Sequence, residues 1–240
     1  MAAAPENLQA LIIGINAYSN GIPPLRSAVN DAEAIATLLT EEFGYQVHLL
    51  CDEQATAEGI RTALKKFKDT ATAQTRLFFY FAGHGIALDG ADSADGPVGY
   101  AIPQDATTEE DTFLPMQELH DGLVILPCQH LLVVLDCCFA GSFRWAGLTR
   151  KAVPSKRMYR ERFERFLRGN ARQVITSAAH DEKALDVLSR FGDREGDGDG
   201  ASHSPFAQLL MDGLRGKGDL SQDGVTTATE LYIYLNTELA

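Results

Sequence analysis

The sequence has few cysteines, no long apolar run and a shortage of basic residues, and each of these excludes a class of protein. Its four cysteines, two of them adjacent, do not form the framework of a disulfide-rich secreted domain. Every apolar run is well short of the ~20 residues that a membrane-spanning helix needs. The first residues lack the basic and apolar regions of a secretory signal. We therefore expect a cytoplasmic protein that has no membrane partner.

Basic residues are outnumbered by acidic residues, 21 against 33, and the formal net charge is −12. This balance disfavours nucleic acid as a partner. The basic residues are also unevenly distributed, because ten of them lie between Arg144 and Arg172, where only Glu161 and Glu164 oppose them. We interpret residues 144–172 as a basic linker.

Apolar runs alternate with amphipathic stretches along the 240 residues, which is the pattern of one α/β domain with a mostly parallel sheet and helices on its faces. We expect strands at residues 11–15, 45–50, 76–81, 98–103, 130–135 and 173–177. We expect helices at residues 27–43, 56–67, 115–123, 206–214 and 227–239. The first three strands alternate directly with two helices, and strands joined in this way run parallel.

Two of the expected strands end in chemically active residues. One leads into Asp136, Cys137 and Cys138, and another leads into His84, which lies between two glycines. In parallel sheets, functional groups lie just beyond the carboxyl ends of the strands. On the first strand alone, buried structural cysteines are the simpler interpretation, but a thiol and an imidazole at one edge form a nucleophile–base pair. Because side chains alternate along a strand, Asp136 and Cys138 should share one side and Cys137 should face the other.

These two strand ends resemble a known family. Phe-Ala-Gly-His-Gly at residues 81–85, followed by Asp-Cys-Cys-Phe-Ala-Gly at residues 136–141, resembles the motifs of caspase-like cysteine peptidases, whose His lies about 50 residues before the Cys. The likeness is closer to metacaspases and bacterial caspase-like (orthocaspase) proteins, which carry Ser-Gly-His-Gly and Asp-x-Cys-x-Ser/Ala-Gly, than to caspases. It covers nearly the whole chain and implies a caspase-like three-layer sandwich, in which helices flank a mostly parallel sheet.

The resemblance implies a cysteine endopeptidase with Cys138 as its nucleophile and His84 as its base. It also implies that the backbone N–H groups of Gly85 and Cys138 hold the oxyanion of the reaction. Cys137 is left with a role in packing. The alternative is a catalytically silent caspase-like scaffold, an interaction domain within a larger protein.

The resemblance further divides the chain into parts of one caspase-like domain. Residues 1–143 form a part like the large subunit, residues 144–172 form the basic linker, and residues 173–240 form a part like the small subunit. Further domains of a longer chain are compatible with this division.

Two carboxylates are expected to select the substrate. Asp31 lies in a segment similar to the metacaspase loop-to-helix segment whose Asp joins in the primary pocket, and Asp136 lies two residues before Cys138. Together they would favour Arg or Lys and repel acidic side chains, so that the partners would be proteins with Arg or Lys at the cleaved bond. Each residue also has a simpler explanation, because Asp31 would stabilise the first turn of a helix and Asp136 would cap a strand end.

The basic linker offers residues that such a pocket would accept. We expect the protein to be a zymogen that is processed in this linker, because exposed polar segments are where chains are cut. Two alternatives are an inhibitory strap across the acidic cleft and a docking surface for an acidic partner. The candidate cleavage sites are Arg150, Lys151, Lys156 and Arg157.

Residues 219–230 match the spacing of an EF-hand calcium loop. The candidate ligands are Asp219, Ser221, Asp223 and Glu230. The same residues also fit an ordinary turn followed by a capping box of Thr227 and Glu230. Metacaspases bind calcium through a cluster of Asp residues, and the matching stretch here, residues 113–116, has no carboxylate. We therefore favour the turn and expect no required cofactor, with calcium as the alternative.

Overall fold

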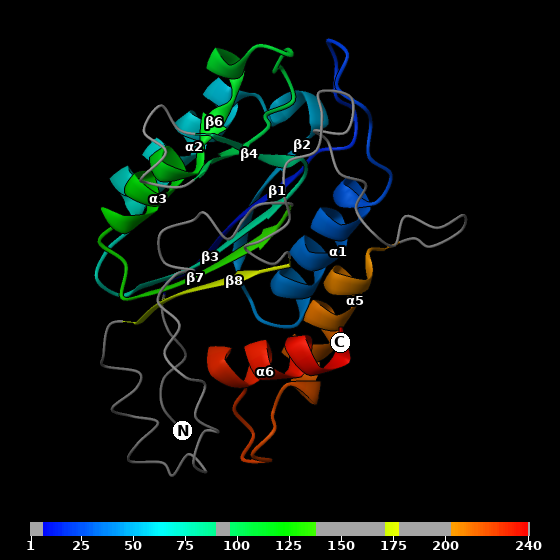
Figure 1. Ribbon diagram of the computed structural model, residues 1–240. Coiled ribbons are helices and arrows are strands. Elements are labelled where there is room, and N and C mark those ends of the chain that lie inside the picture. Colours follow the sequence, from blue (N-terminus) through cyan, green and yellow to red (C-terminus); the bar gives the residue numbers. More distant parts are fainter. Residues whose placement is uncertain (1–6, 90–96, 138–170, 178–202, 240) are drawn as a thin grey trace.

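The central sheet is formed by five parallel strands. The computed structural model describes residues 7–89, 97–137, 171–177 and 203–239 (Figure 1). The strands of the sheet are β1 (Asn7–Gly14), β2 (Gln46–Cys51), β3 (Thr75–Ala82), β7 (His130–Asp136) and β8 (Ala171–Thr176). They lie in the order β2-β1-β3-β7-β8, and each adjacent pair is parallel. The parallel sheet predicted from the sequence is confirmed.

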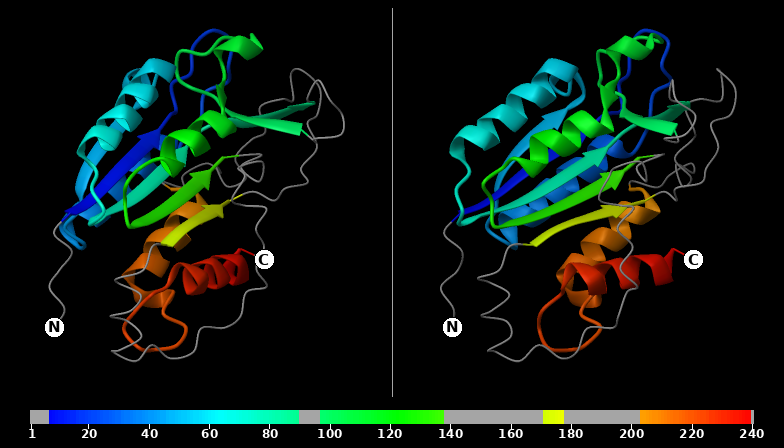
Figure 2. Two further views of the ribbon diagram at one scale, coloured as in Figure 1. Left: turned by 90° about the vertical axis from the view of Figure 1, so that its left-hand side faces the viewer. Right: turned by 60° about the vertical axis from the view of Figure 1, so that its left-hand side comes forward.

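Helices cover both faces of this sheet (Figures 1 and 2). One face carries α2 (Ala57–Thr70) and α3 (Met116–Val124), and the other carries α1 (Ala28–Glu41), α5 (Pro205–Asp212) and α6 (Ala228–Glu238). Single turns of helix lie at η1 (Asp52–Gln54), η2 (Glu110–Thr112) and η4 (Gly213–Lys217). The three-layer sandwich is thus confirmed. Among the described residues, no helix is both long and apolar enough to cross a membrane.

The strands are apolar on both sides because helices cover both sides. On β1, Leu11 and Ile13 pack with the residues of α2 and α3, whereas Ala10 and Ile12 pack with those of α1 and α5. All four are completely buried, at 0% exposure. Burial of one such leucine or isoleucine stabilises the fold by about 1.5–3 kcal/mol.

The helices begin and end where their local sequences dictate. Thr56 accepts a hydrogen bond from the Gly59 N–H and caps α2. Gly44, with a φ of +73°, lies in the turn that follows α1. The helix predicted at residues 115–123 begins instead at Met116, because Pro115 has extended backbone and pairs with β5.

A small antiparallel sheet follows directly after His84. It consists of β4 (Gly85–Asp89), β5 (Pro97–Ala101) and β6 (Leu114–Pro115). The sequence predicts only the second of these strands, because β4 and β6 are too short to show a clear alternation of apolar and polar residues. This sheet lies at the carboxyl ends of β1 and β3 (Figure 1), where the candidate site is found.

Candidate active site

The site begins where β3 and β7 end side by side. Ala82 is the register partner of Asp136, and the Gly83 N–H donates to the Asp136 carbonyl oxygen over 3.4 Å. His84 is two residues beyond Ala82, and Cys138 is two residues beyond Asp136. Cys138 itself lies outside the described residues. In the chain, His84 and Cys138 therefore follow equivalent points of two neighbouring strands. Neighbouring strands of a sheet lie ~4.8 Å apart.

The His84 imidazole is buried, at 4% exposure, and it has a fixed tautomer. Its Nε2 lies 2.9 Å from the carbonyl oxygen of Pro23. A carbonyl oxygen only accepts hydrogen bonds, so Nε2 must carry the proton and donate it. In the neutral ring Nδ1 is then the basic nitrogen. The ring can accept a proton at Nδ1 while Pro23 holds it in place from the other side.

Tyr18 holds the same histidine from the backbone side. Its hydroxyl accepts a hydrogen bond from the His84 N–H over 2.8 Å and lies 3.3 Å from the Ile102 carbonyl oxygen, to which it donates. The Tyr18 and His84 rings pack with their centroids 4.8 Å apart. A Cβ added to Gly83 would lie 2.7 Å from the Tyr18 hydroxyl, so the glycine is needed for this approach. The sequence indicates neither Tyr18 nor Pro23 as a partner of His84.

Gly85, the predicted oxyanion donor, opens β4 next to the histidine. The Ile102 N–H donates to the His84 carbonyl oxygen over 3.0 Å, and Gly85 is paired with Ala101 in the antiparallel ladder. Opposite residues in such a ladder alternate between bonded and non-bonded pairs. Gly85 and Ala101 therefore form a non-bonded pair, and the Gly85 N–H points away from β5.

The two predicted pocket carboxylates, Asp31 and Asp136, are linked through Ser204, which donates a hydrogen bond to each of them. The Ser204 N–H donates to the Asp31 carboxylate, at 3.1 and 3.3 Å from its two oxygens, and the Ser204 hydroxyl donates to Asp136 Oδ2 over 3.3 Å. The Tyr80 hydroxyl also donates to Asp136 Oδ2, over 3.1 Å. Asp31 and Asp136 are 0% and 4% exposed. Buried carboxylates require such donors, since an unpaired buried charge is costly.

Asp31 has a second partner that the sequence does not indicate. His203 Nδ1 lies 3.0 Å from Asp31 Oδ1. The dipeptide Ser204-Pro205 before an apolar run is a recognisable helix start, and Ser204 does cap α5 by accepting the Ala207 N–H. That signal could have located the cap, but no sequence signal points from it to Asp31. Asp31 also lies in the first turn of α1. Its carboxylate can therefore also stabilise the start of this helix, as the alternative explanation expects.

The described cysteines are poorly suited to nucleophilic attack. Burial, with the nearby Glu33 and Asp52 carboxylates, raises the pKa of the Cys51 thiol to about 11. Burial also raises the pKa of the Cys128 thiol. Cys137 is 2% exposed and packs on the face covered by α2 and α3, which confirms its predicted packing role.

The remaining sequence predictions concern the linker and calcium. The candidate cleavage sites Arg150, Lys151, Lys156 and Arg157 lie outside the described residues. In the calcium candidate, Asp219 accepts the N–H groups of Asp223 and Gly224. Glu230 forms the capping box with Thr227 and accepts the Ser221 N–H. Within the described ranges, no three His, Cys, Asp or Glu side chains form a group that could hold a metal ion.

Comparison with known proteins adds to this geometry. The protein family described as "Caspase domain" matches this chain over residues 8–239. Metacaspase-1A of Aspergillus oryzae is 33% identical over 155 residues, which are 59% of this chain and 36% of that protein. Metacaspase III c of Phaeodactylum tricornutum is 27% identical over 152 residues, 58% of this chain and 44% of that protein. The chain thus spans less than half the length of these curated relatives.

A solved structure supports the fold independently. The crystal structure of protein GSU0716 from Geobacter sulfurreducens matches with a TM-score of 0.59 and 19% identity. The match covers 87% of this chain and 82% of that one.

Proposed function

The chain belongs to the caspase domain family of cysteine-type endopeptidases, and we propose that it hydrolyses peptide bonds with Cys138 as the nucleophile and His84 as the base. The observation that carries this proposal is the hydrogen bond from His84 Nε2 to the Pro23 carbonyl oxygen. It leaves Nδ1 as the basic nitrogen at the edge of the sheet where the cysteine strand also ends.

The reaction follows from the protonation state of the dyad. A thiolate attacks a peptide carbonyl, whereas a thiol does not, and an adjacent imidazole lowers the thiol pKa by accepting its proton. His84 takes the Cys138 proton at Nδ1 and later gives it to the amine that leaves. Water then hydrolyses the thioester and restores the free thiol. Because the pKa values of Cys51 and Cys128 are raised, those thiols do not compete for this role.

The negative charge that develops on the carbonyl oxygen needs hydrogen-bond donors. We assign this role to the backbone N–H groups of Gly85 and Cys138. The orientation of the Gly85 N–H away from β5 supports the assignment. Loss of one such donor typically lowers the rate by roughly 10²–10³-fold.

Asp31 and Asp136 are proposed to bind an Arg or Lys side chain before the cleaved bond. Both carboxylates are buried and contact the same residue, Ser204, so they form one acidic cluster beside the proposed dyad. A charge in a desolvated site interacts more strongly than one in water. The protein substrates would be cut after Arg or Lys, and the basic linker at residues 144–172 would be a substrate of the same site.

The decisive experiment incubates the purified protein with fluorogenic peptides that end in Arg, Lys or Asp, with and without calcium. We expect hydrolysis of the Arg and Lys peptides only, and none by Cys138→Ala. Asp31→Asn and Asp136→Asn should raise KM for the Arg peptide, because each removes one negative charge and keeps the shape of the side chain. Hydrolysis of no peptide by the folded wild-type protein would favour the catalytically silent scaffold.

A further inference from the structure

The loop between β1 and α1, which contacts His84, is itself anchored by a carboxylate. Asp52 is the first residue after β2, the strand that lies beside β1 in the sheet. Its Oδ1 accepts the backbone N–H of Asn16 over 2.7 Å and the backbone N–H of Ala17 over 2.8 Å. Both residues lie at the start of the loop. One carboxylate oxygen therefore fixes two consecutive peptide groups at the point where the loop leaves the sheet.

Hydrogen bonds connect this anchor with both contacts of the histidine. The carbonyl oxygen of Asn16 accepts the Tyr18 N–H over 3.1 Å and the Leu25 N–H over 3.0 Å. Tyr18 in turn accepts the backbone N–H of His84. Pro23, which accepts the hydrogen bond of the imidazole, lies within the segment that Asn16 and Leu25 close. The position of the Asn16 peptide thus bears on the backbone and on the ring of the histidine.

The side chain of Asn16 also closes the loop onto α1. Its Nδ2 donates to the Arg26 carbonyl oxygen over 3.2 Å, and its Oδ1 accepts the Val29 N–H over 3.3 Å. These bonds tie the far end of the loop to the residue at its start. Because Asp52 holds that residue, the carboxylate influences the loop over its whole length.

Asp52 adopts a backbone conformation that is uncommon for a residue with a side chain. Its φ of +43° lies in the left-handed region, where aspartate and asparagine are found more often than other non-glycine residues. A conformation of this kind costs free energy and persists only where the surrounding structure requires it. Glycine would adopt it more readily. The contribution of an aspartate at this position therefore lies in its carboxylate.

We propose that Asp52 is a positioning residue for peptide hydrolysis, which holds His84 in place through the loop between β1 and α1. This inference rests on the proposed function of His84 as the base. Proton transfer depends on the placement of the base, and a shift of about 1 Å can lower a rate by about 10²-fold. Asp52 acts on the base and not on the substrate, so its loss lowers kcat and leaves KM nearly unchanged.

Two substitutions of Asp52 separate its acceptor oxygen from its backbone and its charge. Asp52→Gly removes the acceptor and relieves the backbone. Asp52→Asn removes only the charge, because the amide keeps an acceptor oxygen and asparagine tolerates a positive φ. In steady-state kinetics with an Arg peptide, we expect Asp52→Gly to lower kcat about tenfold at nearly unchanged KM. Asp52→Asn should retain most of kcat.

A second measurement reports on the histidine without turnover. In full-length Cys138→Ala protein with ¹⁵N-labelled histidine, the NMR shifts of the ring nitrogens show which nitrogen carries the proton. The spectra are recorded at about pH 8, where an ordinary histidine is neutral. His84 should be the Nε2–H tautomer in this protein and after the added substitution Asp52→Asn. Adding Asp52→Gly should produce a mixture of tautomers. His84→Gln assigns the signals.

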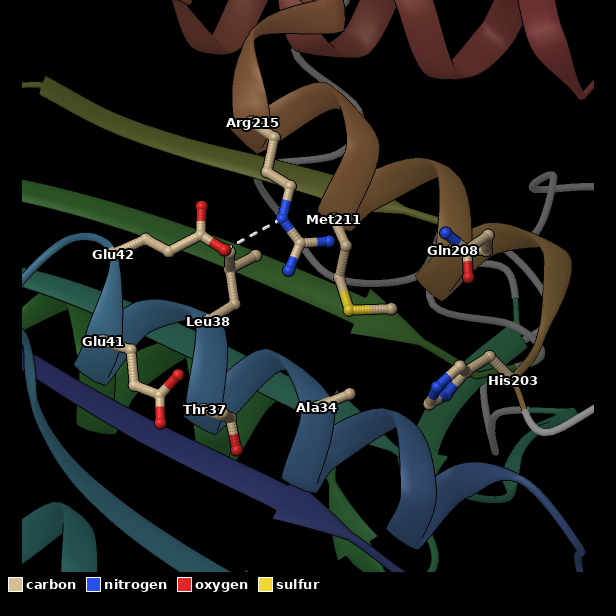
Figure 3. Close-up of a pocket in the computed structure, with 9 residues that line it drawn as sticks. All are labelled: Ala34, Thr37, Leu38, Glu41, Glu42, His203, Gln208, Met211 and Arg215. Carbon is tan, nitrogen blue, oxygen red and sulfur yellow. Dashed lines mark hydrogen bonds and ion pairs between the residues drawn. The ribbon is translucent and has the colours of Figure 1, made fainter.

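Glu42→Gly is the matched control, because it also replaces an anchoring carboxylate by glycine. Glu42 follows the last residue of α1 and accepts a hydrogen bond from Arg215 Nε over 2.9 Å, across the groove between α1 and α5 (Figure 3). The loop that contacts His84 precedes the opposite end of α1. We expect the parent kcat and the parent tautomer in this variant. Thermal unfolding of every variant measures any loss of stability.

The outcomes distinguish this inference from the proposed function. An unchanged kcat and an unchanged tautomer in folded Asp52→Gly overturn the positioning role, and so does an equal loss of kcat in Asp52→Asn. If Asp52→Gly does not fold, Asp52→Ser takes its place, because its shorter side chain brings no oxygen to the same position. Tautomer mixing in Asp52→Gly, together with no hydrolysis by the wild type, overturns the peptidase activity but not the hold of Asp52 on His84.

Discussion

The backbone N–H of His84 donates a hydrogen bond of 2.8 Å to the hydroxyl of Tyr18. Tyr18 belongs to the loop that joins β1 to α1, and Pro23 of the same loop accepts the hydrogen bond of the imidazole. One loop therefore holds both the backbone and the ring of the histidine. Because β1 and β3 are adjacent strands, this loop reaches His84 directly at the sheet edge.

Tyr18→Phe should lower kcat and leave KM nearly unchanged. The substitution keeps the ring that packs on His84 but removes the acceptor of its N–H. A buried N–H left unpaired costs about 1–3 kcal/mol, and the resulting shift of the histidine should lower kcat by about tenfold or more. Steady-state kinetics with an Arg peptide measure this effect. Tyr100→Phe is the control, because it also removes one tyrosine hydroxyl, while the Tyr100 ring packs against Phe113. Equal kcat in both variants would contradict the positioning role.

The two adjacent cysteines should respond differently to substitution. Cys138→Ala should abolish turnover, and Cys137→Ala should retain most of it. Cys137 packs in the core on the face opposite Asp136, so its loss should lower the free energy of unfolding by about 1 kcal/mol. Peptide hydrolysis and chemical denaturation measure the two effects. Comparable loss of turnover in two folded variants would refute the assignment of the nucleophile.

Ser204→Ala should affect both stability and substrate binding. It removes the cap of α5 and the hydroxyl that contacts Asp136. Loss of such a cap lowers the free energy of unfolding by about 1 kcal/mol. Asp136 would also lose one of its hydrogen-bond donors, which should raise KM for an Arg peptide several-fold. Thr227→Ala is the matched control, because Thr227 caps α6 without contacting either pocket carboxylate. If both variants lose stability but neither changes KM, Ser204 acts only as a helix cap.

Self-processing can be detected by mass. Intact-mass analysis of the wild type should show two fragments whose boundary falls between Arg144 and Arg172. Cys138→Ala should remain a single chain, because cutting would require the same thiol. We expect the cut in this segment because it contains ten of the 21 basic residues of the protein. A wild-type protein that stays a single chain at full activity would rule out self-processing, and the basic segment would need another role.

Calcium should leave the thermal stability unchanged. The Asp219 and Glu230 carboxylates accept backbone N–H groups within their own turn and helix cap, so they are not arranged around a shared ion. A ligand present at 100 times its Kd would stabilise the folded state by about 2.7 kcal/mol, which thermal unfolding would readily detect. A calcium-dependent rise in Tm that disappears in Asp219→Asn would restore the EF-hand interpretation.

The sequence by itself determined those features that depend on near neighbours in the chain. Uninterrupted apolar runs predicted the strand that leads to His84 and the strand that leads to Asp136, because a strand that helices cover on both faces is apolar on both sides. The alternation of side chains along a strand placed Cys137 on the face opposite Asp136. The capping box of Thr227 and Glu230 was also recognisable, since both partners lie within one helical turn.

Only the tertiary structure decided which distant residues meet. Asp31 and Ser204 are 173 positions apart, and their hydrogen bond exists because α5 packs beside α1 on the same face of the sheet. Tyr18 and His84 are 66 positions apart and meet because β1 and β3 are neighbours. Strand order and helix packing arise from burial of apolar surface, which is not directional. The polar partners that this packing brings together therefore leave no pattern in the sequence.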